Sequence, residues 1–337
     1  MSNDVVEKSV EAFVADLRRL TDEVSRLIVG HRDIVDGVTT CLLAGGHALL
    51  EGVQGLGKTM LVRTLARALN ITFSRIQFTP DLMPADVVGT NMITEDEAGH
   101  RAFSFQRGPV FTHILLADEI NRATPKTQSA MLEAMQEKRV TVGGTHLELE
   151  PPFFVMATQN PLEMEGTYPL PEAQLDRFFF KILLGLPDRK ELNTILTRTT
   201  GKDEADLGVI MKHETVLDWI KLAREVVIAE HVQDYAVRLT LATHPEGEFA
   251  SDPVKQYVRY GSSPRGAQAL ILSAKIRALL DGRFNVSYTD VEAGVLPALR
   301  HRLILNFEAE ADAVTADSIL GGFREHVPRQ MAEAVGV

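Results

Sequence analysis

The chain has 337 residues, of which 45% are hydrophobic and 24% are charged, a composition typical of a globular protein. Its 46 acidic and 35 basic residues give a formal net charge of −11, which opposes non-specific attraction to nucleic acid or anionic membranes. Cys41 is the single cysteine, so an intramolecular disulfide is excluded. Residues 1–30 have no basic start followed by an apolar stretch, and the apolar runs are too short to span a bilayer, so we expect a cytoplasmic protein.

The amino-terminal part predicts two helices, then a strand, a turn and a third helix. Apolar residues recur at steps of three and four over 5–28, which predicts an amphipathic helix. A second helix is expected over 34–46, where it ends at glycines. The apolar run at 47–52 predicts a strand, and a helical period resumes over 58–69 after a glycine-rich turn.

Further short apolar runs predict more strands, at 71–77, 113–118, 153–158 and 178–184. Helical segments separate several of them, which favours a largely parallel sheet with helices on both faces. One such helix is expected over 125–138, with Thr124 as its cap and proline at its first position. Alternating residues predict two hairpins that interrupt this pattern, one near 88–105 and one near 139–149 with Gly-Gly at its turn.

The character of the sequence changes near residue 187. Residues 188–337 show helical periods and no convincing central strand, most clearly over 265–282 and 288–303. We therefore predict two domains, an α/β core over 1–187 and a helical domain over 188–337.

The segment GVQGLGKT at 52–59 matches the phosphate-binding pattern G-x-x-x-x-G-K-[ST] at every fixed position, between a predicted strand and a predicted helix. Its glycines let backbone N–H groups approach phosphate oxygens. Lys58 supplies a positive charge for the β- and γ-phosphates of ATP, and Thr59 offers a hydroxyl to Mg²⁺. The predicted nucleotide-binding residues here are Gly52, Val53, Gln54, Gly55, Leu56, Gly57, Lys58, Thr59 and Met60.

Polar residues also follow two other predicted strands. Asp118 and Glu119 end the run HILLADE, where open α/β sheets bind their ligands. Beside a phosphate-binding loop, Asp118 is expected to hold Mg²⁺ and Glu119 to deprotonate the attacking water. Asn160 ends the run FFVMATQN and is expected to bond to the water or the γ-phosphate. An acidic pair after a strand can also cap a helix, and an asparagine before Pro161 can also form a turn. The three motifs therefore predict a nucleotide site mainly when they are taken together.

Four further segments resemble the MoxR group of AAA+ ATPases: DEINRATPKTQSAMLEAMQE (118–137), ATQNP (157–161), YPLPEAQLDRF (168–178) and SSPRG (262–266). The resemblance covers nearly the whole chain. It implies an αβα sandwich around a parallel five-stranded sheet, followed by an all-α lid. It also implies assembly into rings, usually hexamers, with ATP bound between subunits. The two predicted hairpins match the helix-2 insert and the pre-sensor-1 hairpin of this clade.

The resemblance assigns roles to further residues. Asn160 resembles sensor 1, Arg177 the arginine finger that reaches the neighbouring subunit's γ-phosphate, and Arg265 the sensor 2 arginine of the lid. Arginines there would stabilise charge on the γ-oxygens during transfer, although a surface ion pair is the alternative for Arg177. Val29 and Gly30 lie where AAA+ proteins contact adenine. Arg122 is a candidate second interface arginine.

The leading hypothesis is therefore a ring-forming MoxR-type ATPase that hydrolyses ATP with Mg²⁺. By resemblance, it would remodel or mature a client protein together with a protein that carries a von Willebrand factor A domain. The alternatives are the motor subunit of a metal chelatase or a nucleic-acid translocase of the same clade, and the net acidity disfavours the translocase. A small-molecule kinase or GTPase-like switch is a further alternative. The ten histidines are scattered without an H-x-x-x-H pair, so no dedicated zinc site is expected.

Overall fold

A computed structural model describes residues 3–30, 32–53, 56–95, 101–160, 166–200 and 207–330. Contacts divide the chain into two compact units. The sheet unit is Arg19–Arg177 with Ile182–Leu217, and the helical unit is Met1–Arg18, Phe178–Lys181 and Asp218–Val337. Residues just beyond the predicted domain boundary near 187 thus cluster with the sheet, and that boundary itself stays a prediction.

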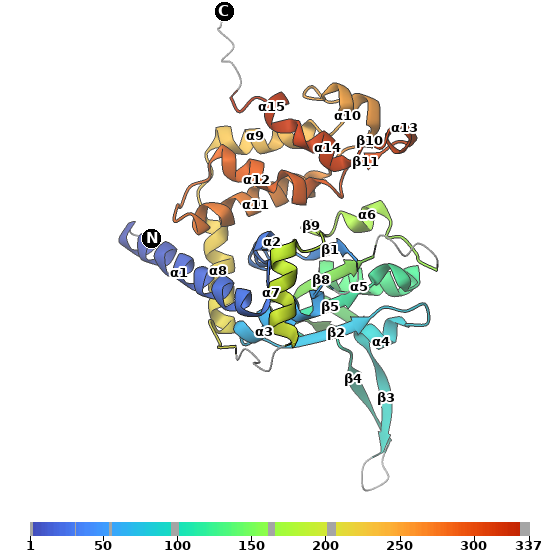
Figure 1. The fold of residues 1–337 in the computed structure, drawn as a ribbon. Coiled ribbons are helices and arrows are strands. Elements are labelled where there is room, and N and C mark those ends of the chain that lie inside the picture. The colour runs from blue at the N-terminus through green and yellow to red at the C-terminus, as the bar shows by residue number, and fades with distance from the viewer. Residues whose placement is uncertain are drawn as a thin grey trace, which may run out of the picture. The chain divides into compact units, whose positions relative to one another are not determined.

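A five-stranded parallel sheet forms the centre of the sheet unit, in the order β2-β5-β8-β1-β9 (Figure 1). The predicted strands are confirmed, with these bounds: β1 Ala48–Gly52, β2 Phe73–Gln77, β5 Ile114–Asp118, β8 Phe154–Gln159 and β9 Phe180–Leu184. Strand β5 is buried on both faces, as its continuous apolar run predicts, because its first four residues are fully inaccessible. The carboxyl ends of β2, β5, β8 and β1 therefore meet at one edge of the sheet.

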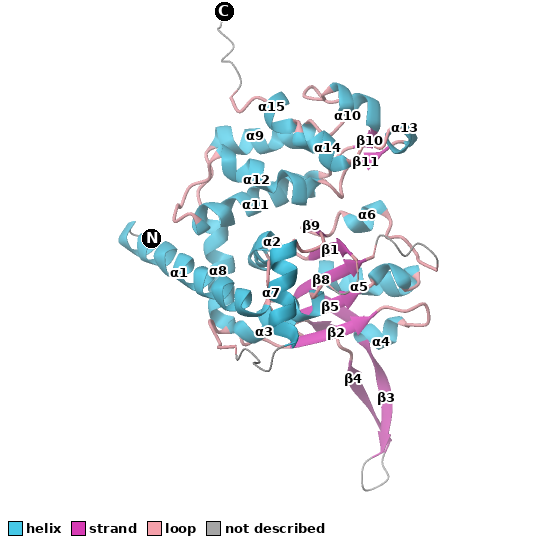
Figure 2. Cartoon of the chain, in the orientation of Figure 1, coloured by secondary structure: helices cyan, strands magenta, loops and turns pink. Residues whose placement is uncertain are grey.

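Helices flank the sheet (Figure 2). Their bounds are α2 Arg32–Ala44, α3 Lys58–Ala68, α4 Pro84–Val88, the 3-10 turn η1 Ile120–Arg122, α5 Pro125–Glu137, α6 Glu172–Leu175 and α7 Arg189–Thr200. Thr124 lies at the predicted N-cap position of α5, but it does not form the expected capping hydrogen bond. Thr124 occupies the N-cap, yet its side chain makes no capping bond to the helix backbone, and its hydroxyl lies 3.4 Å from that of Thr127.

Both predicted hairpins are present in the sheet unit. Strands β3 (Gly89–Glu95) and β4 (Arg101–Arg107) pair antiparallel and extend away from the sheet (Figure 2), and residues 96–100 lie outside the described chain. Strands β6 (Arg139–Val142) and β7 (Thr145–Glu148) pair around Gly143 and Gly144. These glycines have φ of 56° and 80°, so the turn uses the left-handed conformations that Gly-Gly allows without strain.

Two long helices contribute to both units, α1 (Asn3–Leu27) and α8 (His213–Glu225). The predicted amphipathic pattern of α1 is confirmed, because its buried residues recur at steps of three and four: Val10, Phe13, Leu17, Leu20 and Val24. Within the helical unit, the ring of Phe13 packs edge-on against Trp219 at 5.6 Å, and the indole N–H of Trp219 donates to Asp16 at 3.1 Å. Among the described residues, no helix combines the length and apolar character that crossing a membrane requires.

The rest of the helical unit consists of α9 Glu230–Leu241, α10 Asp252–Tyr257, α11 Pro264–Leu280, α12 Tyr288–Leu299, α13 Phe307–Ala311, α14 Ala316–Gly321 and α15 Phe323–His326. The fold is thus the predicted α/β core with a helical lid. The lid also contains one short antiparallel ladder, between β10 (Val258–Tyr260) and β11 (Ile304–Leu305). Strands of this length are too short to give a periodic signal in the sequence.

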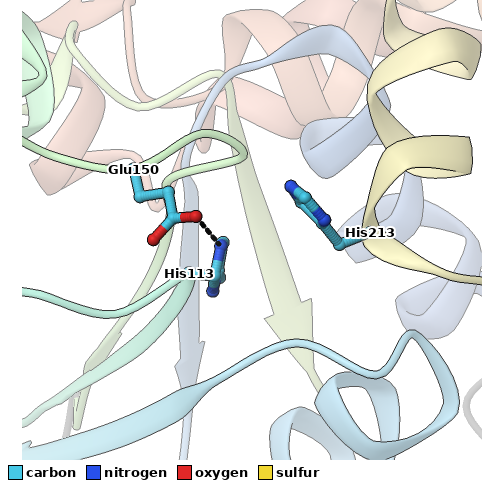
Figure 3. Close-up of side chains that lie close together, drawn as sticks. All are labelled: His113, Glu150 and His213. Atoms are coloured by element: carbon cyan, nitrogen blue, oxygen red, sulfur yellow. Dashed lines mark ion pairs between the residues drawn. The ribbon is translucent and has the colours of Figure 1, made fainter.

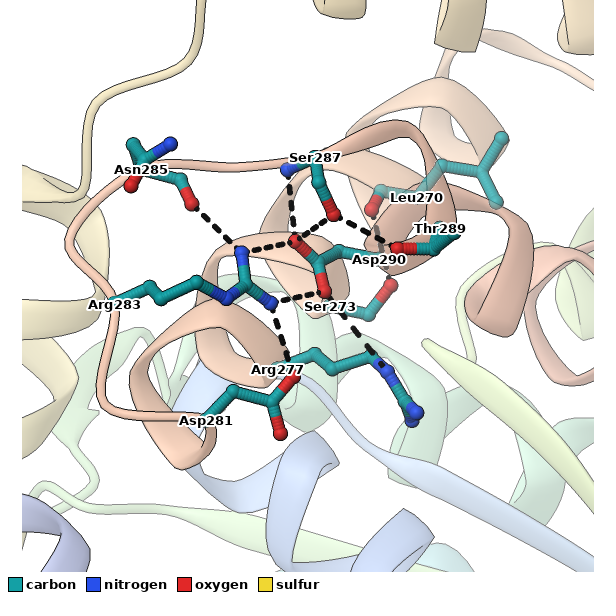
Figure 4. A network of polar contacts seen from close by, with 9 residues as sticks. All are labelled: Leu270, Ser273, Arg277, Asp281, Arg283, Asn285, Ser287, Thr289 and Asp290. Carbon is teal, nitrogen blue, oxygen red and sulfur yellow. Dashed lines mark hydrogen bonds and ion pairs between the residues drawn. The ribbon is translucent and has the colours of Figure 1, made fainter.

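A polar network fixes the start of α12 inside the helical unit (Figure 4). Asp290 is 1% exposed and accepts bonds from both terminal nitrogens of Arg283, at 2.8 and 2.9 Å, and from the backbone and hydroxyl of Ser287. Burial alone raises the pKa of Asp290, but the bonds from Arg283 and Ser287 outweigh it and hold that pKa below its ordinary value. Ser287 is therefore the N-cap of α12.

Candidate functional site

The loop between β1 and α3 combines two glycines that are needed for different reasons. A Cβ on Gly52 would lie 2.6 Å from the carbonyl oxygen of Leu184, so only glycine lets β1 and β9 approach this closely. Gly57 has φ of 77° and would meet no atom with a Cβ, so the backbone conformation itself selects glycine there. Gln54 and Gly55, which the sequence also assigns to this loop, lie outside the described residues.

Lys58 opens helix α3 and is half-buried at this loop. Its ammonium donates to the carbonyl oxygen of Gly52 at 2.6 Å. Burial lowers the pKa of Lys58, while Asp118, Glu119 and Glu51 oppose that shift. A lysine that is short of solvent and held by one neutral carbonyl is well placed to exchange that carbonyl for a phosphate oxygen.

The two acidic residues lie at the carboxyl end of β5, as predicted, and a threonine of the neighbouring strand forms a hydrogen bond with each of them. Glu119 leaves the strand with φ of 56°, a left-handed conformation that non-glycine residues seldom adopt. The hydroxyl of Thr158, on β8, accepts from the Glu119 N–H at 2.9 Å and donates to Oδ1 of Asp118 at 2.6 Å. Thr158 was not among the predicted site residues, although it lies two positions before Asn160 on the same strand end.

Strand β2 contributes two further side chains that the sequence analysis missed. Arg75 donates to Oδ2 of Asp118 at 2.7 Å through its terminal nitrogen and at 3.2 Å through Nε. Gln77 donates to Oε2 of Glu119 at 2.9 Å, and Arg122 reaches the same oxygen at 2.9 Å. Because Glu119 is only 8% exposed, these bonds fix its carboxylate in a nearly dry position. This contact between Arg122 and Glu119 is within one chain.

These residues surround one cavity of about 690 Å³ in the sheet unit, within the usual size of a small-molecule site. Its lining is Leu56, Gly57, Lys58, Thr59, Met60, Arg75, Gln77, Asp118, Glu119, Arg122, Thr158 and Asn160. Asn160 is 9% exposed and completes the wall beyond β8. The structure thus brings five predicted chemical groups together: an ammonium, a hydroxyl, two carboxylates and a carboxamide.

The donor set fits a magnesium ion. Thr59 and Asp118 both line the cavity, and hydroxyl and carboxylate oxygens are the hard ligands that Mg²⁺ prefers. Both oxygens of Asp118 already accept hydrogen bonds, from Thr158 and Arg75. Since Mg²⁺ usually keeps several of its waters, these bonds do not exclude a contact between the ion and Asp118 through water.

Val29 and Gly30 line a second cavity of the sheet unit, of about 480 Å³. Its other walls are Ser25, Ile28, Arg32, Asp33, Ile34, Leu183, Gly185, Leu186, Glu191 and Arg198. Gly30 has φ of 70°, and a Cβ there would collide with the carboxylate of Glu191. The positive φ explains the glycine, because the end of the Glu191 side chain is free to move aside. The predicted contact with adenine stays a prediction.

Of the two predicted arginines, Arg177 belongs to the same unit as the nucleotide cavity and does not line it. Arg177 follows α6 in the sheet unit, and its backbone N–H bonds to Gln174 at 3.2 Å. Arg265 belongs to the helical unit, near the start of α11, where its N–H donates to the hydroxyl of Ser263 at 3.2 Å. Their predicted roles at the γ-phosphate stay predictions.

Two known families match successive parts of the chain. The ATPase family associated with various cellular activities (AAA) matches residues 47–180, which include the phosphate-binding loop and both acidic residues. The AAA lid domain matches residues 252–321.

Individual proteins match over almost the full length. The chain is 42% identical to Chaperone MoxR1 of Mycobacterium tuberculosis, with 97% of this chain and 86% of that protein covered. It is 28% identical to Protein MoxR of Methylorubrum extorquens, with 94% and 97% covered. Among solved structures, a protein of Cytophaga hutchinsonii described as a candidate ATPase is 38% identical and superposes with a TM-score of 0.91 over 97% of this chain and 99% of that one.

Proposed function

Because this chain belongs to the MoxR family of AAA+ ATPases, we propose that it binds ATP with Mg²⁺ in the 690 Å³ cavity and hydrolyses it to ADP and phosphate. One observation carries the proposal. The ammonium of Lys58 and the carboxylates of Asp118 and Glu119 lie around a single cavity at the carboxyl ends of parallel strands, where this class of sheet binds its ligands.

In the proposed reaction, Lys58 and the N–H groups at the start of α3 bind the phosphates. Thr59 and Asp118 would hold Mg²⁺, which would neutralise charge on the phosphate oxygens. Glu119 takes a proton as a water oxygen bonds to the γ-phosphorus, and the bond from that phosphorus to the β–γ bridging oxygen breaks. Gln77 and Arg122 orient the carboxylate through Oε2. Asn160 positions the water.

We further propose that a second copy of the chain completes the site. Arg177 lies outside the cavity of its own chain, which is what a residue that serves a neighbouring subunit requires. An arginine supplied at the γ-phosphate accelerates phosphoryl transfer by about 10³–10⁵-fold. Arg265 would report the γ-phosphate to the helical lid, so that hydrolysis moves lid against core. The family favours a ring, usually of six subunits.

The work done by this ring is proposed to be chaperone-like. A relative at 42% identity is named a chaperone, which supports remodelling or maturation of a client protein. A location in the cytoplasm is part of the same proposal. A partner with a von Willebrand factor A domain remains part of the proposal on family grounds. A chelatase motor or a nucleic-acid translocase are the alternatives, and a net charge of −11 opposes the latter.

Phosphate release and ATP binding test the hydrolysis proposal with three variants. Glu119→Gln should keep ATP affinity and lose turnover by about 10²–10⁴-fold, because the amide cannot accept the proton. Lys58→Ala should lose ATP binding, whereas Lys126→Ala, at an exposed lysine of α5, should match the unmodified protein. Unchanged ATP affinity in Lys58→Ala would refute the assignment of the phosphate-binding loop.

Light scattering after gel filtration tests assembly separately. The Glu119→Gln variant should shift to a ring-sized mass when ATP and Mg²⁺ are added, because bound ATP would hold the subunits together. A monomer under both conditions would count against a shared site.

A further inference from the structure

Three side chains from separate segments of the sheet unit face one another (Figure 3), and none of them lines the nucleotide cavity. His113 immediately precedes β5, Glu150 follows β7, and His213 is the first residue of α8. One ligand atom from each lies within 4.8 Å of the other two. Nε2 of His113 is 3.9 Å from Oε1 of Glu150, and the two imidazole rings are 5.5 Å apart between centroids. Figure 3 shows the ring of His113 between the other two side chains.

His113, the middle residue of the three, has a ring nitrogen that forms no hydrogen bond with the protein. Nε2 of His113 is buried and has no hydrogen-bond partner, since the nearest carboxylate oxygen is too distant for a bond. A buried polar atom without a partner costs about 1–3 kcal/mol, so native proteins seldom keep one without a ligand or water. The burial of His113 also lowers its pKa, which favours the neutral form of the ring.

The other nitrogen of His113 is held firmly. Nδ1 lies 2.7 Å from the hydroxyl of Thr72 and 3.4 Å from the Thr72 backbone nitrogen. That hydroxyl also accepts from the backbone N–H of His113 at 3.0 Å and from Thr112 at 3.1 Å. A metal-binding histidine donates its outer ring N–H, so zinc binding through Nε2 requires the ring proton to sit on Nδ1. The Thr72 hydroxyl would then accept that proton's bond and donate in turn to Thr112, the reverse of the present direction between the two hydroxyls.

We propose that His113, Glu150 and His213 bind one zinc ion, with water in the fourth position. Two imidazole nitrogens and one carboxylate oxygen form a ligand set that suits Zn²⁺, whereas Mg²⁺ and Ca²⁺ select oxygen ligands. At zinc–ligand distances of about 2.0–2.2 Å, tetrahedral ligand atoms lie roughly 3.3 Å apart. The three atoms must therefore approach by up to about 1.5 Å. Glu150, with its side chain 75% exposed outside any helix or strand, and His213, 30% exposed, can make that movement.

This zinc site is distinct from the magnesium site of the nucleotide cavity. His113 and Asp118 lie at opposite ends of β5, which at 3.3 Å per residue are roughly 16 Å apart. The ion would join the start of β5, the segment before β8 and the start of α8, so its role is to stabilise the sheet unit. Spacing motifs miss it because the ligands come from three distant segments, and the sequence-based expectation of no zinc site rested on such motifs.

Metal content tests this proposal without reference to ATP turnover. The full chain, without a histidine tag, is stripped with EDTA, returned to buffered Zn²⁺, desalted and analysed by elemental mass spectrometry. We expect about one zinc per chain, and a Co²⁺ form with the strong visible absorption of tetrahedral cobalt. His213→Gln and Glu150→Gln should each weaken binding by at least ~10–100-fold. The matched control is His146→Gln, at an exposed histidine of β7.

Thermal unfolding gives a second readout on the same proteins. Zn²⁺ should raise the midpoint of the unmodified chain and of His146→Gln, and leave His213→Gln and Glu150→Gln unchanged, because an ion that binds only the folded state stabilises it. Because the side chain of Glu150 is exposed, Glu150→Gln should not disturb folding, so a loss of zinc binding in this variant cannot be ascribed to misfolding. Equal zinc content in the unmodified chain and His213→Gln, or no zinc retained by the unmodified chain, would overturn the proposal.

Discussion

Replacing Thr158 by valine tests whether its hydroxyl positions both acidic residues of the cavity. The side chain is 1% exposed, and valine has nearly its shape, so the change removes little except the hydroxyl. The bond to Asp118 is 2.6 Å long and involves a charged acceptor, and the bond from the Glu119 N–H is 2.9 Å long. Each such bond is worth about 1–3 kcal/mol when buried.

The second bond matters most for turnover. Glu119 has φ of 56°, and a left-handed conformation at a non-glycine residue costs about 1–3 kcal/mol. The free-energy cost of this conformation is similar to the stabilisation that the hydrogen bond from Thr158 provides. Loss of the hydroxyl should therefore let the backbone of Glu119 relax to another conformation. If about 1.4–2.8 kcal/mol of transition-state stabilisation is lost, kcat falls by about 10–100-fold. ATP affinity should change little, since Lys58 and the phosphate-binding loop are untouched.

The assay compares steady-state phosphate release and ATP binding in Thr158→Val and in Thr127→Val. Thr127 is fully buried in the same unit and donates to the carbonyl oxygen of Leu82 at 2.6 Å, so its replacement also removes a buried bond. Both variants should unfold at lower temperature, but only Thr158→Val should lose turnover. A Thr158→Val protein with the kcat of the unmodified chain would refute the reasoning.

Three other changes have expected results. Arg75→Gln should lower the Mg²⁺ concentration for half-maximal hydrolysis about 2–5-fold, because a half-exposed ion pair worth about 0.5–1 kcal/mol no longer competes for the carboxylate; an unchanged or higher requirement contradicts this. Asp290→Asn should lower the free energy of unfolding by about 2–4 kcal/mol in urea titrations, since it removes a buried partner of Arg283. Asp281→Asn, whose side chain is 54% exposed beside the same arginine, should cost less than about 1 kcal/mol, and equal losses would refute the account. Burial lowers the pKa of His47 to about 4. Below pH 6.5, the ordinary pKa of histidine, the unfolded chain therefore gains a proton at this position that the folded chain does not, and His47 alone should lower the free energy of unfolding by about 2 kcal/mol from pH 7 to pH 5. His47→Gln should flatten this dependence, and an equal slope in both proteins would contradict it.

The parts of the site that the sequence could predict are those that one short segment specifies. The phosphate-binding loop is local, so its spacing identifies Lys58 and Thr59 directly. Asp118 and Asn160 were predictable because each follows an apolar run that reads as a buried strand. Parallel strands then place those ends together without further information.

Residues that depend on strand order were missed. Arg75 and Gln77 contact the acidic residues only because β2 lies beside β5, and Thr158 does so only because β8 lies on the other side. No single segment of the sequence predicts the strand order β2-β5-β8-β1-β9, because that order depends on contacts between distant segments. The bonding of Thr124 was missed for a related reason, because a residue type favours a cap position without fixing its rotamer.

The central claim is that a second copy of the chain completes each ATP site, and mixing two inactive variants tests it most directly. Arg177→Ala should bind ATP without turnover, and Glu119→Gln should do the same. In an equal mixture, about a quarter of the interfaces would pair an intact Glu119 with an intact Arg177 from the neighbour, as random head-to-tail assembly requires. We predict that phosphate release returns to about a quarter of the unmodified rate. No recovery at any mixing ratio would contradict the shared site.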